Sequence, residues 1–305
     1  MDFKSAIKRI LPNKAIKYNE PMRFHTTFRI GGPADYFLEP SADELKPLLD
    51  ACNEYHVPYI VIGNGSNILV GDLGIRGAVI CLGKRISDLS VQDAGTRCVI
   101  RAQAGAMLSF VAYKALEMGC TGMEFASGIP GSVGGALVMN AGAYGGEMKD
   151  ILRELTVMDR RGNTFIWRPE DYDGSYRDSA VFRKQVIALE AEFVLPKGDP
   201  MSVKAKMDEL KEKRIEKQPL EYPSAGSTFK RPPNNFAGKL IMEAGLSGFT
   251  VGGACVSQKH CGFVINKGGA TAQDVVKLVE EVRRQVKLKS GIVLEPEIKM
   301  IGEFK

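Results

Sequence analysis

One glycine-rich segment, residues 126–146, constrains the fold of this chain more than any other stretch. Its sequence, ASGIPGSVGGALVMNAGAYGG, holds seven glycines and no charged residue. So much glycine argues against a regular helix or strand, and the lack of charge argues against a loop surrounded by water. We therefore expect an irregular segment that something covers. The cover is either a large, flat, partly apolar ligand with a diphosphate or the protein's own sheet.

A second glycine cluster, GNGSN at residues 63–67, follows an apolar stretch that is typical of a buried strand. Glycine permits positive φ and lets backbone N–H groups approach a phosphate closely. The third glycine of the dinucleotide fingerprint is missing here, and no amphipathic helix follows. A Rossmann fold is therefore not indicated, and a tight turn between strands is the other interpretation of this cluster.

Strands and helices alternate along the first two thirds of the chain. Ser41 and Glu44 form a capping box that opens a helix. Residues 155–158 and 164–167 flank a polar turn, which predicts a hairpin. Residues 195–200, with two prolines and a glycine, are the best candidate for a linker.

The last third of the chain has its own periodicity. Apolar positions from Val203 to Leu210 line one face of a helix that Pro219 must end, and a second helix opens at Thr271 and closes near Gly291. Residues 292–301 predict a final strand, in which Glu297 would share a face with Glu295 and Lys299. We expect two lobes, 1–82 and 83–196, followed by a C-terminal domain, 197–305.

The positive charge of the chain is concentrated in that C-terminal domain. Residues 197–305 hold 19 Lys and Arg against 13 Asp and Glu, an excess of +6, whereas the first 196 residues carry a balance of −1. Such an excess attracts phosphate groups on a small molecule or nucleic acid, or it belongs to a solvated surface. Aromatic residues are sparse there, so the segment offers no stacking platform for nucleic acid.

Two features indicate a cytoplasmic protein that does not insert into membranes. No apolar run reaches the roughly 18 residues that a membrane span needs, and residues 1–17 carry charges throughout, with no apolar core of a signal peptide. The six cysteines include no CxxC pair, and with three scattered histidines they offer no metal-ligand spacing. We expect reduced thiols and no bound metal.

Five motifs occur in order across nearly the whole chain: GNGSN, ASGIPGSVGGAxxxNAGAYG, SYRDS, SAGSTFK and LEPEI. Together they make the chain resemble the UDP-N-acetylenolpyruvoylglucosamine reductase family, flavoenzymes of bacterial cell-wall precursor synthesis. The resemblance implies an α+β fold, with a two-lobed FAD-binding domain of the vanillyl-alcohol-oxidase type and a C-terminal α+β substrate domain. It also implies reduction of the enolpyruvyl ether of UDP-N-acetylglucosamine enolpyruvate to UDP-N-acetylmuramate, with NADPH as hydride donor.

The resemblance assigns noncovalent FAD binding to residues of the two glycine clusters. They are Gly63, Asn64, Gly65, Ser66, Asn67, Leu69, Ser127, Gly128, Ile129, Pro130, Gly131, Ser132, Gly134, Gly135, Asn140, Gly142 and Tyr144. No histidine lies within either cluster, so a histidyl-linked flavin has no support. The resemblance further implies a monomer.

The motifs of the family also supply catalytic residues. Arg177 matches the arginine for the substrate carboxylate, Ser227 the proton donor and Glu297 the catalytic glutamate. A planar guanidinium suits a carboxylate better than a lysine does, and a serine acts as an acid only with cations or dipoles beside it. Arg183 and Arg168 are nearby competitors of Arg177.

The resemblance assigns substrate contacts to four residues: Tyr176, Lys217, Lys230 and Arg231. Arg231 stands where one branch of the family carries asparagine. The short distance from Arg177 to the strand at Val186 leaves no room for an extra loop with a substrate-binding tyrosine. The chain therefore looks like the shorter branch of the family. The alternatives are another FAD-dependent oxidoreductase of the same fold group and a non-catalytic nucleotide-sugar-binding protein.

Overall fold

The computed structural model describes residues 2–305, and their contacts divide the chain into two compact units. Unit 1 comprises Met1–Lys17, Tyr36–Asn64 and Ala78–Arg214, and unit 2 comprises Tyr18–Asp35, Gly65–Gly77 and Ile215–Lys305. Both units are therefore assembled from separated pieces of sequence. The three-part division at residues 82 and 196 stays a prediction.

The main sheet of unit 1 is antiparallel, with its five strands in the order β11-β10-β12-β7-β6. These strands are β6 (Leu89–Asp93), β7 (Arg97–Gln103), β10 (Leu152–Met158), β11 (Thr164–Trp167) and β12 (Ile187–Pro196). The hairpin predicted from the sequence is confirmed, because β10 and β11 pair with Leu155 opposite Trp167 and Met158 opposite Thr164.

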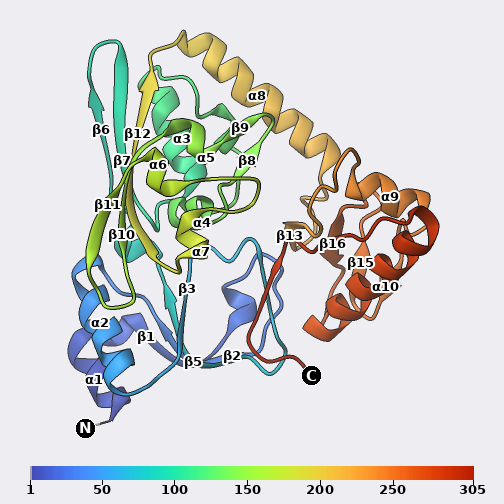
Figure 1. Ribbon diagram of the computed structural model, residues 1–305, viewed down its shortest axis with the longest axis horizontal. Coiled ribbons are helices and arrows are strands. Elements are labelled where there is room, and N and C mark those ends of the chain that lie inside the picture. Colours follow the sequence, from blue (N-terminus) through green and yellow to red (C-terminus); the bar gives the residue numbers. More distant parts are fainter. Residues whose placement is uncertain (1) are drawn as a thin grey trace. The chain divides into compact units, whose positions relative to one another are not determined.

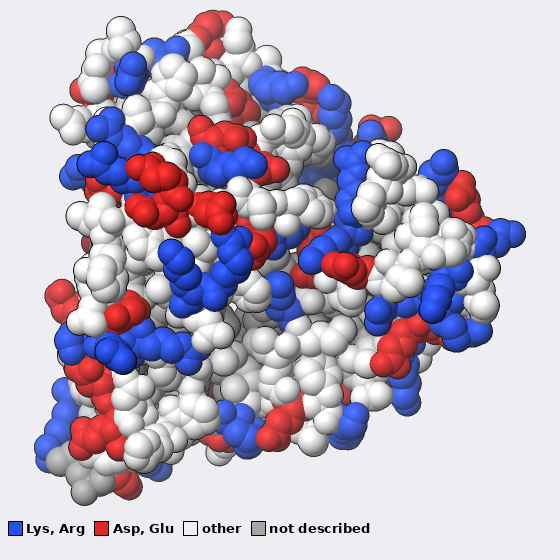
Figure 2. Space-filling model, viewed as in Figure 1, with Lys and Arg blue, Asp and Glu red and all other residues white. Residues whose placement is uncertain are grey.

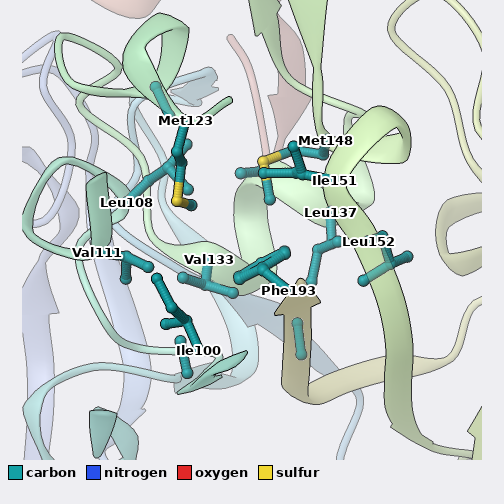
Figure 3. Packing of buried hydrophobic residues seen from close by; sticks show 14 of the residues in the cluster. Ile100, Leu108, Val111, Met123, Val133, Leu137, Met148, Ile151, Leu152 and Phe193 are labelled. Atoms are coloured by element: carbon teal, nitrogen blue, oxygen red, sulfur yellow. The ribbon is translucent and has the colours of Figure 1, made fainter. Parts of the chain in front are cut away.

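Short helices cover one face of this sheet (Figure 1). They are α3 (Leu108–Glu117), α4 (Val133–Val138) and α5 (Met148–Ile151). Between helices and sheet lies a core in which Ile100, Leu137 and Phe193 are fully buried (Figure 3). Burying each such side chain contributes about 1.5–3 kcal/mol, so this core holds the glycine-rich segment, which includes α4, against the sheet.

A second sheet, of order β1-β2-β5-β3, carries the N-terminal helices. Its elements are α1 (Phe3–Ile10), β1 (Ile16–Pro21), β2 (Pro33–Leu38), α2 (Ala42–Glu54), β3 (Tyr59–Ile62) and β5 (Ile75–Cys81). The helix start predicted at Ser41 is confirmed, since the Ser41 N–H donates to Glu44 Oε2 at 2.9 Å. Strand β3 runs parallel to β5, with Tyr59 opposite Ala78, and ends where the GNGSN cluster begins.

The remaining elements of unit 1 are short, apart from the helix that leads into unit 2. They are η1 (Asn13–Ala15), η3 (Lys84–Ile86), η4 (Glu124–Ala126), β8 (Gly142–Ala143), β9 (Gly146–Glu147), α6 (Pro169–Tyr172), α7 (Ala180–Arg183) and α8 (Pro200–Lys217). Helix α8 ends before Pro219, as the sequence predicts.

Unit 2 packs two helices against an antiparallel sheet of order β13-β16-β15-β14. Its elements are η2 (Met22–Phe24), β4 (Ile68–Val70), β13 (Ser224–Ser227), α9 (Ala237–Glu243), β14 (Thr250–Val251), β15 (Ala254–Val256), β16 (Phe263–Asn266), α10 (Ala272–Ser290) and β17 (Lys299–Ile301). The predicted ends of α10 are confirmed: Thr271 Oγ1 accepts the Asp274 N–H at 3.0 Å, and Gly291 adopts φ 74°.

Within unit 2, strands far apart in sequence are paired. Strand β17 runs parallel to β4, with Lys299 opposite Ile68 and Met300 opposite Leu69. The predicted final strand over 292–301 is therefore wrong in length, because only Lys299–Ile301 is a strand. Pro296 has no N–H to donate to a ladder, so regular pairing starts after it.

The expectation that the segment 126–146 contains no regular element is also wrong. Helix α4 forms inside it, and Ser132 Oγ accepts the Gly135 N–H at its start. A Cβ on Gly134 would lie 2.8 Å from the Ala104 Cβ. Glycine at this position therefore permits close packing of α4, a gain that offsets its poor helix propensity.

A disulfide joins Cys98 and Cys120, so the expectation of six reduced thiols is wrong for this pair. Their Cα atoms lie 6.4 Å apart, because α3 returns the chain to the start of β7, where Cys98 lies. The spacing of 22 residues gives no local signal of such a pair. Within the described residues, no helix combines the length and the apolar character that crossing a membrane requires.

Candidate active site

The two glycine clusters of the sequence meet in unit 1. Asn64 Nδ2 donates to the Pro130 carbonyl at 2.6 Å, and a Cβ on Gly63 would lie 2.1 Å from Ser132 Oγ. Residue 63 therefore has to be glycine for the strand β3 end to approach this loop so closely. The contact joins Gly63 and Asn64, the first two residues of GNGSN, to SGIPGS in one backbone surface of unit 1.

Several backbone donors on this surface have no partner within residues 2–305. The N–H groups of Gly128, Gly131 and Ser132 make no hydrogen bond there, whereas the N–H of Gly134 donates to the Ala104 carbonyl at 2.8 Å. Successive unpaired N–H groups at a turn bind phosphate oxygens. We call this backbone surface, formed by Gly63, Asn64 and the segment Gly128–Gly134, the flavin cradle. Its close backbone approach and its unpaired N–H groups fit the diphosphate of FAD.

The rest of the GNGSN cluster belongs to unit 2. Gly65 adopts φ 64°, and a Cβ there would lie 2.0 Å from the His25 carbonyl oxygen. Asn67 Nδ2 donates to the Glu297 carbonyl at 3.3 Å, and the Lys299 N–H donates to the Asn67 carbonyl at 2.9 Å. The side chain of Leu69 lies fully buried in the core of unit 2, so it is not available to contact a ligand.

Asn140 organises the end of the glycine-rich segment. The residue is buried at 2% exposure, and its backbone adopts φ 40°, which asparagine tolerates better than most residues. Its Nδ2 donates to Glu147 Oε2 at 2.8 Å and to the Ser175 carbonyl at 3.0 Å, while its Oδ1 accepts the Lys149 N–H at 3.0 Å. These bonds connect the NAGAYG loop to the loop that carries Tyr176 and Arg177.

Arg177 lies on that second loop, with φ 56°. Its Nη1 donates to the Gly142 carbonyl at 3.4 Å, and its guanidinium lies 5.7 Å from the centre of the Tyr176 ring. Arg183, the nearby competitor, forms ion pairs with Asp173 and Asp178. Its charge is therefore already neutralised, so Arg183 is a weak candidate for binding an anionic ligand.

Ser227 and Glu297 lie on adjacent segments of unit 2. The Glu297 N–H donates to the Thr228 carbonyl, and the Lys230 N–H donates to the Glu295 carbonyl, both at 2.8 Å. Ser227 ends β13 and lies opposite Phe263 of β16. Glu297 is 6% exposed, and a carboxylate so far from water is rare outside paired or functional positions. The side chain faces expected from a continuous strand are wrong here, because Glu295 is exposed while Glu297 is buried.

The predicted substrate residues of unit 2 have different surroundings. Lys230 Nζ lies 3.1 Å from Glu295 Oε2, and the Arg231 guanidinium lies 4.1 Å from the centre of the Phe236 ring. Lys217 lies exposed at the end of α8, with no ion pair in the part of the chain that the structure describes. No group of three or more His, Cys, Asp or Glu within residues 2–305 is placed to hold a metal ion.

Sequence reasoning missed Arg214 as a site residue. The guanidinium lies against Gly128 of the glycine-rich segment, and its burial lowers the pKa of the group. Its spacing from Val203, Met207 and Leu210 indicated a place on the buried face of the helix. What could have drawn attention to it is that a charged residue occupies that apolar stripe.

Two family models match the chain. The model for the C-terminal domain of UDP-N-acetylenolpyruvoylglucosamine reductase matches residues 218–301, and a model for an FAD binding domain matches residues 34–166. These matches confirm the expected fold class, in which an FAD-binding domain precedes a C-terminal domain of mixed helix and sheet. FAD as the expected cofactor is confirmed with it.

Relatives match over nearly the full length of the chain. The UDP-N-acetylenolpyruvoylglucosamine reductase of Agathobacter rectalis is 53% identical, covering 99% of both chains, and that of Clostridioides difficile is 49% identical, covering 96% of both. Among solved structures, the UDP-N-acetylenolpyruvylglucosamine reductase from Thermus caldophilus matches with a TM-score of 0.78 at 34% identity. That match covers 92% of this chain and 97% of the other.

Proposed function

The chain belongs to the UDP-N-acetylenolpyruvoylglucosamine reductase family, and from that premise we propose its reaction and the residues that carry it. It reduces the enolpyruvyl ether of UDP-N-acetylglucosamine enolpyruvate to UDP-N-acetylmuramate, with NADPH as the hydride donor. The observation that carries the proposal is the sequence identity of 49–53% to named reductases over almost the whole chain.

The flavin cradle of unit 1 is the part of this chain that would hold FAD. Gly63, Asn64 and the loop Gly128–Ser132 supply a close backbone surface and unpaired N–H groups for the diphosphate. FAD, when bound, supplies the two-electron chemistry that links NADPH to the sugar nucleotide. The cradle residues include no carboxylate, imidazole or amine side chain, which supports a role in binding.

Arg177 orients the substrate through its carboxylate. Negative charge builds on that carboxylate when hydride reaches the β-carbon of the double bond, and a bidentate guanidinium stabilises it. The bonds from Asn140 to Ser175 and from Arg177 to Gly142 fix the loop before substrate arrives. Preorganisation of this kind spares the reaction the cost of ordering the arginine.

Ser227 delivers the proton that completes the reduction at the α-carbon. A serine hydroxyl is a weak acid, so neighbouring charge has to stabilise the oxygen that it leaves behind. Glu297 lies on the adjacent segment, which the hydrogen bond from the Glu297 N–H to the Thr228 carbonyl joins to the segment of Ser227. From this position Glu297 orients the reacting groups. The exposed cation Lys217 is suited to a phosphate of the UDP group, with Tyr176, Lys230 and Arg231 as further substrate contacts.

We propose that the protein acts in the cytoplasm and as a monomer. The test is anaerobic mixing of the purified yellow protein with NADPH, followed by titration with the UDP-enolpyruvyl sugar. We expect the flavin absorption to bleach and then to return in proportion to added substrate. A colourless protein that takes up no FAD would overturn the proposal. Bleaching without recovery by this substrate would favour another FAD-dependent oxidoreductase.

A further inference from the structure

Arg214 of α8 occupies a position that its own chain does not explain. Its side chain crosses the backbone at Gly128, where a Cβ would lie 3.0 Å from Arg214 Nη1 and 3.1 Å from Arg214 Cδ. Burial lowers the pKa of this guanidinium, and Tyr144 of the NAGAYG loop lies close enough to act on it electrostatically. The charge thus lies beside Gly128 in the first half of the glycine-rich segment, within electrostatic reach of Tyr144 in the second half.

No group within residues 2–305 neutralises this charge. Lys and Arg lie beside Asp and Glu on the surface of the molecule (Figure 2), and earlier lysines of α8 have acidic partners. Lys204 pairs with Asp208, and both Lys206 and Lys213 pair with Glu209. In the described chain, Arg214 makes neither an ion pair nor a hydrogen bond.

Arg214 is half-buried, and a charge that is partly withdrawn from water without a partner opposes folding. An anion that arrives with a ligand would compensate for this cost. The donors around Arg214 indicate which anion, because the N–H groups of Gly128, Gly131 and Ser132 are also unpaired within residues 2–305. A guanidinium beside several N–H groups suits the oxygens of a diphosphate.

We propose that Arg214 binds a diphosphate at the loop Gly128–Ser132. The inference rests on the proposed function, in which two ligands carry this group: FAD and the UDP sugar. Gly128 contributes to the site, because a Cβ there would require the guanidinium to shift by a few tenths of an ångström. The chemistry is the same for both ligands, so the experiment has to separate them.

The test compares Arg214→Met, which keeps an unbranched apolar stem but removes the charge, with Arg214→Lys, which keeps the charge. The matched control is Lys211→Met, which removes an exposed charge from the same helix. Dissociation of FAD from the yellow holoprotein is followed by the fluorescence of released flavin, and binding of UDP to the holoprotein by calorimetry. If Arg214 binds the FAD diphosphate, Arg214→Met should release FAD roughly tenfold faster or more, as expected for hydrogen bonds to a charged group.

Each outcome decides the proposal. Faster FAD release in Arg214→Met, partly restored in Arg214→Lys and absent in Lys211→Met, supports the FAD diphosphate as the ligand. Unchanged FAD release with UDP affinity lowered about tenfold supports the diphosphate of the sugar nucleotide. If both affinities are unchanged in Arg214→Met, the proposal is overturned. It is also overturned if Arg214→Met and Arg214→Lys lose FAD equally and both lose helical circular dichroism, because packing would then explain the effect.

A failure of this proposal differs from a failure of the proposed function. The unsubstituted protein has to be yellow and to bleach with NADPH for the reaction to stand. Arg214→Met has to change diphosphate affinity for the further inference to stand. A yellow, active parent protein with unaffected Arg214 variants would leave the reaction intact and remove only the site.

Discussion

The flavin cradle of unit 1 and the region of unit 2 around Ser227 and Glu297 differ in the atoms that they offer to a ligand. The cradle offers backbone N–H groups and has no room for further side chain atoms at Gly63 or Gly134. The region of unit 2 has its backbone engaged in hydrogen bonds at Thr228, Lys230 and Glu297, and it offers side chains instead. Adding an atom should therefore damage the first region, and removing one should damage the second.

The largest effect is expected at Arg177. This residue lies in the same unit as the cradle but acts through its side chain, so it shows whether the comparison holds for regions or for whole units. We expect Arg177→Lys to slow reoxidation of the reduced flavin by the enolpyruvyl substrate about 100- to 1,000-fold. A point charge cannot replace two parallel hydrogen bonds, and such a loss costs about 2.7–4 kcal/mol. Stopped-flow absorbance measures the rate.

The control for that variant is Arg183→Lys, whose charge already faces Asp173 and Asp178. We expect its reoxidation rate to stay within a few-fold of the parent rate. If Arg183→Lys had a large effect and Arg177→Lys had normal turnover, binding of the substrate carboxylate would have to be assigned to Arg183.

Ser227 tests the side chain half of the comparison. Ser227→Ala should leave flavin reduction by NADPH unchanged, because that step takes no proton from the serine. Reoxidation by substrate should slow by about 100-fold, the usual effect of losing a general acid. Ser227→Cys should recover part of the rate, since a thiol is the stronger acid, and Ser224→Ala on the same strand should behave like the parent. Slowed reduction with normal reoxidation would make Glu297 the better candidate for the proton donor.

Gly63 tests the backbone half. Gly63→Ala places a Cβ 2.1 Å from Ser132 Oγ, so the cradle has to open, and we expect roughly tenfold weaker FAD binding. Adding Ser132→Ala removes the clashing oxygen and should restore much of the affinity. Gly135→Ala is the control, since its Cβ would lie 3.5 Å from the same oxygen, at ordinary contact distance. Fluorescence titration of FAD measures all four proteins, and equal affinities would show that the cradle tolerates added atoms.

The smallest expected effect concerns His260, which lies in unit 2 away from charged partners. Burial lowers the pKa of His260 below its ordinary value of 6.5, and its Nδ1 accepts the Gly262 N–H at 3.1 Å. The unfolded chain therefore binds the proton more readily, so stability is full above pH 6.5 and declines as the pH falls below it.

We expect the urea midpoint of the parent protein to fall between pH 7 and pH 5. The corresponding fall should be smaller in His260→Gln. His56→Gln, which replaces an exposed histidine, should keep the pH dependence of the parent. An unchanged slope in His260→Gln would assign the pH dependence to other groups.

Local chemistry made much of the fold predictable from the sequence. The start of α2 at Ser41, the hairpin β10–β11 and both ends of α10 follow from caps and periodicity within a few residues. The interleaving of the two units did not follow, because it depends on contacts between distant segments. For the same reason the Cys98–Cys120 disulfide gave no signal.

The site was predictable where a residue type is unusual for its place. A glycine-rich run without charge indicated either a ligand surface or packing on the protein's own sheet before any family resemblance was considered. Ser227 and Glu297 had no such signal, because a serine in a turn and a glutamate in a polar segment are ordinary. Their assignment therefore depended on the motifs, and the burial of Glu297 became visible only in the structure.

The parallel pair β4–β17 determines when unit 2 can complete its folding during translation. Ile68 pairs with Lys299, so the strand beside the GNGSN cluster stays without this partner until residue 299 has left the ribosome. At about 5–20 residues per second that wait is roughly 10 to 50 seconds. During it the nascent chain exposes a strand edge and the core of unit 2, where Leu69 belongs. A chain that stops before residue 299 lacks the partner of β4, so that edge of the strand stays unpaired.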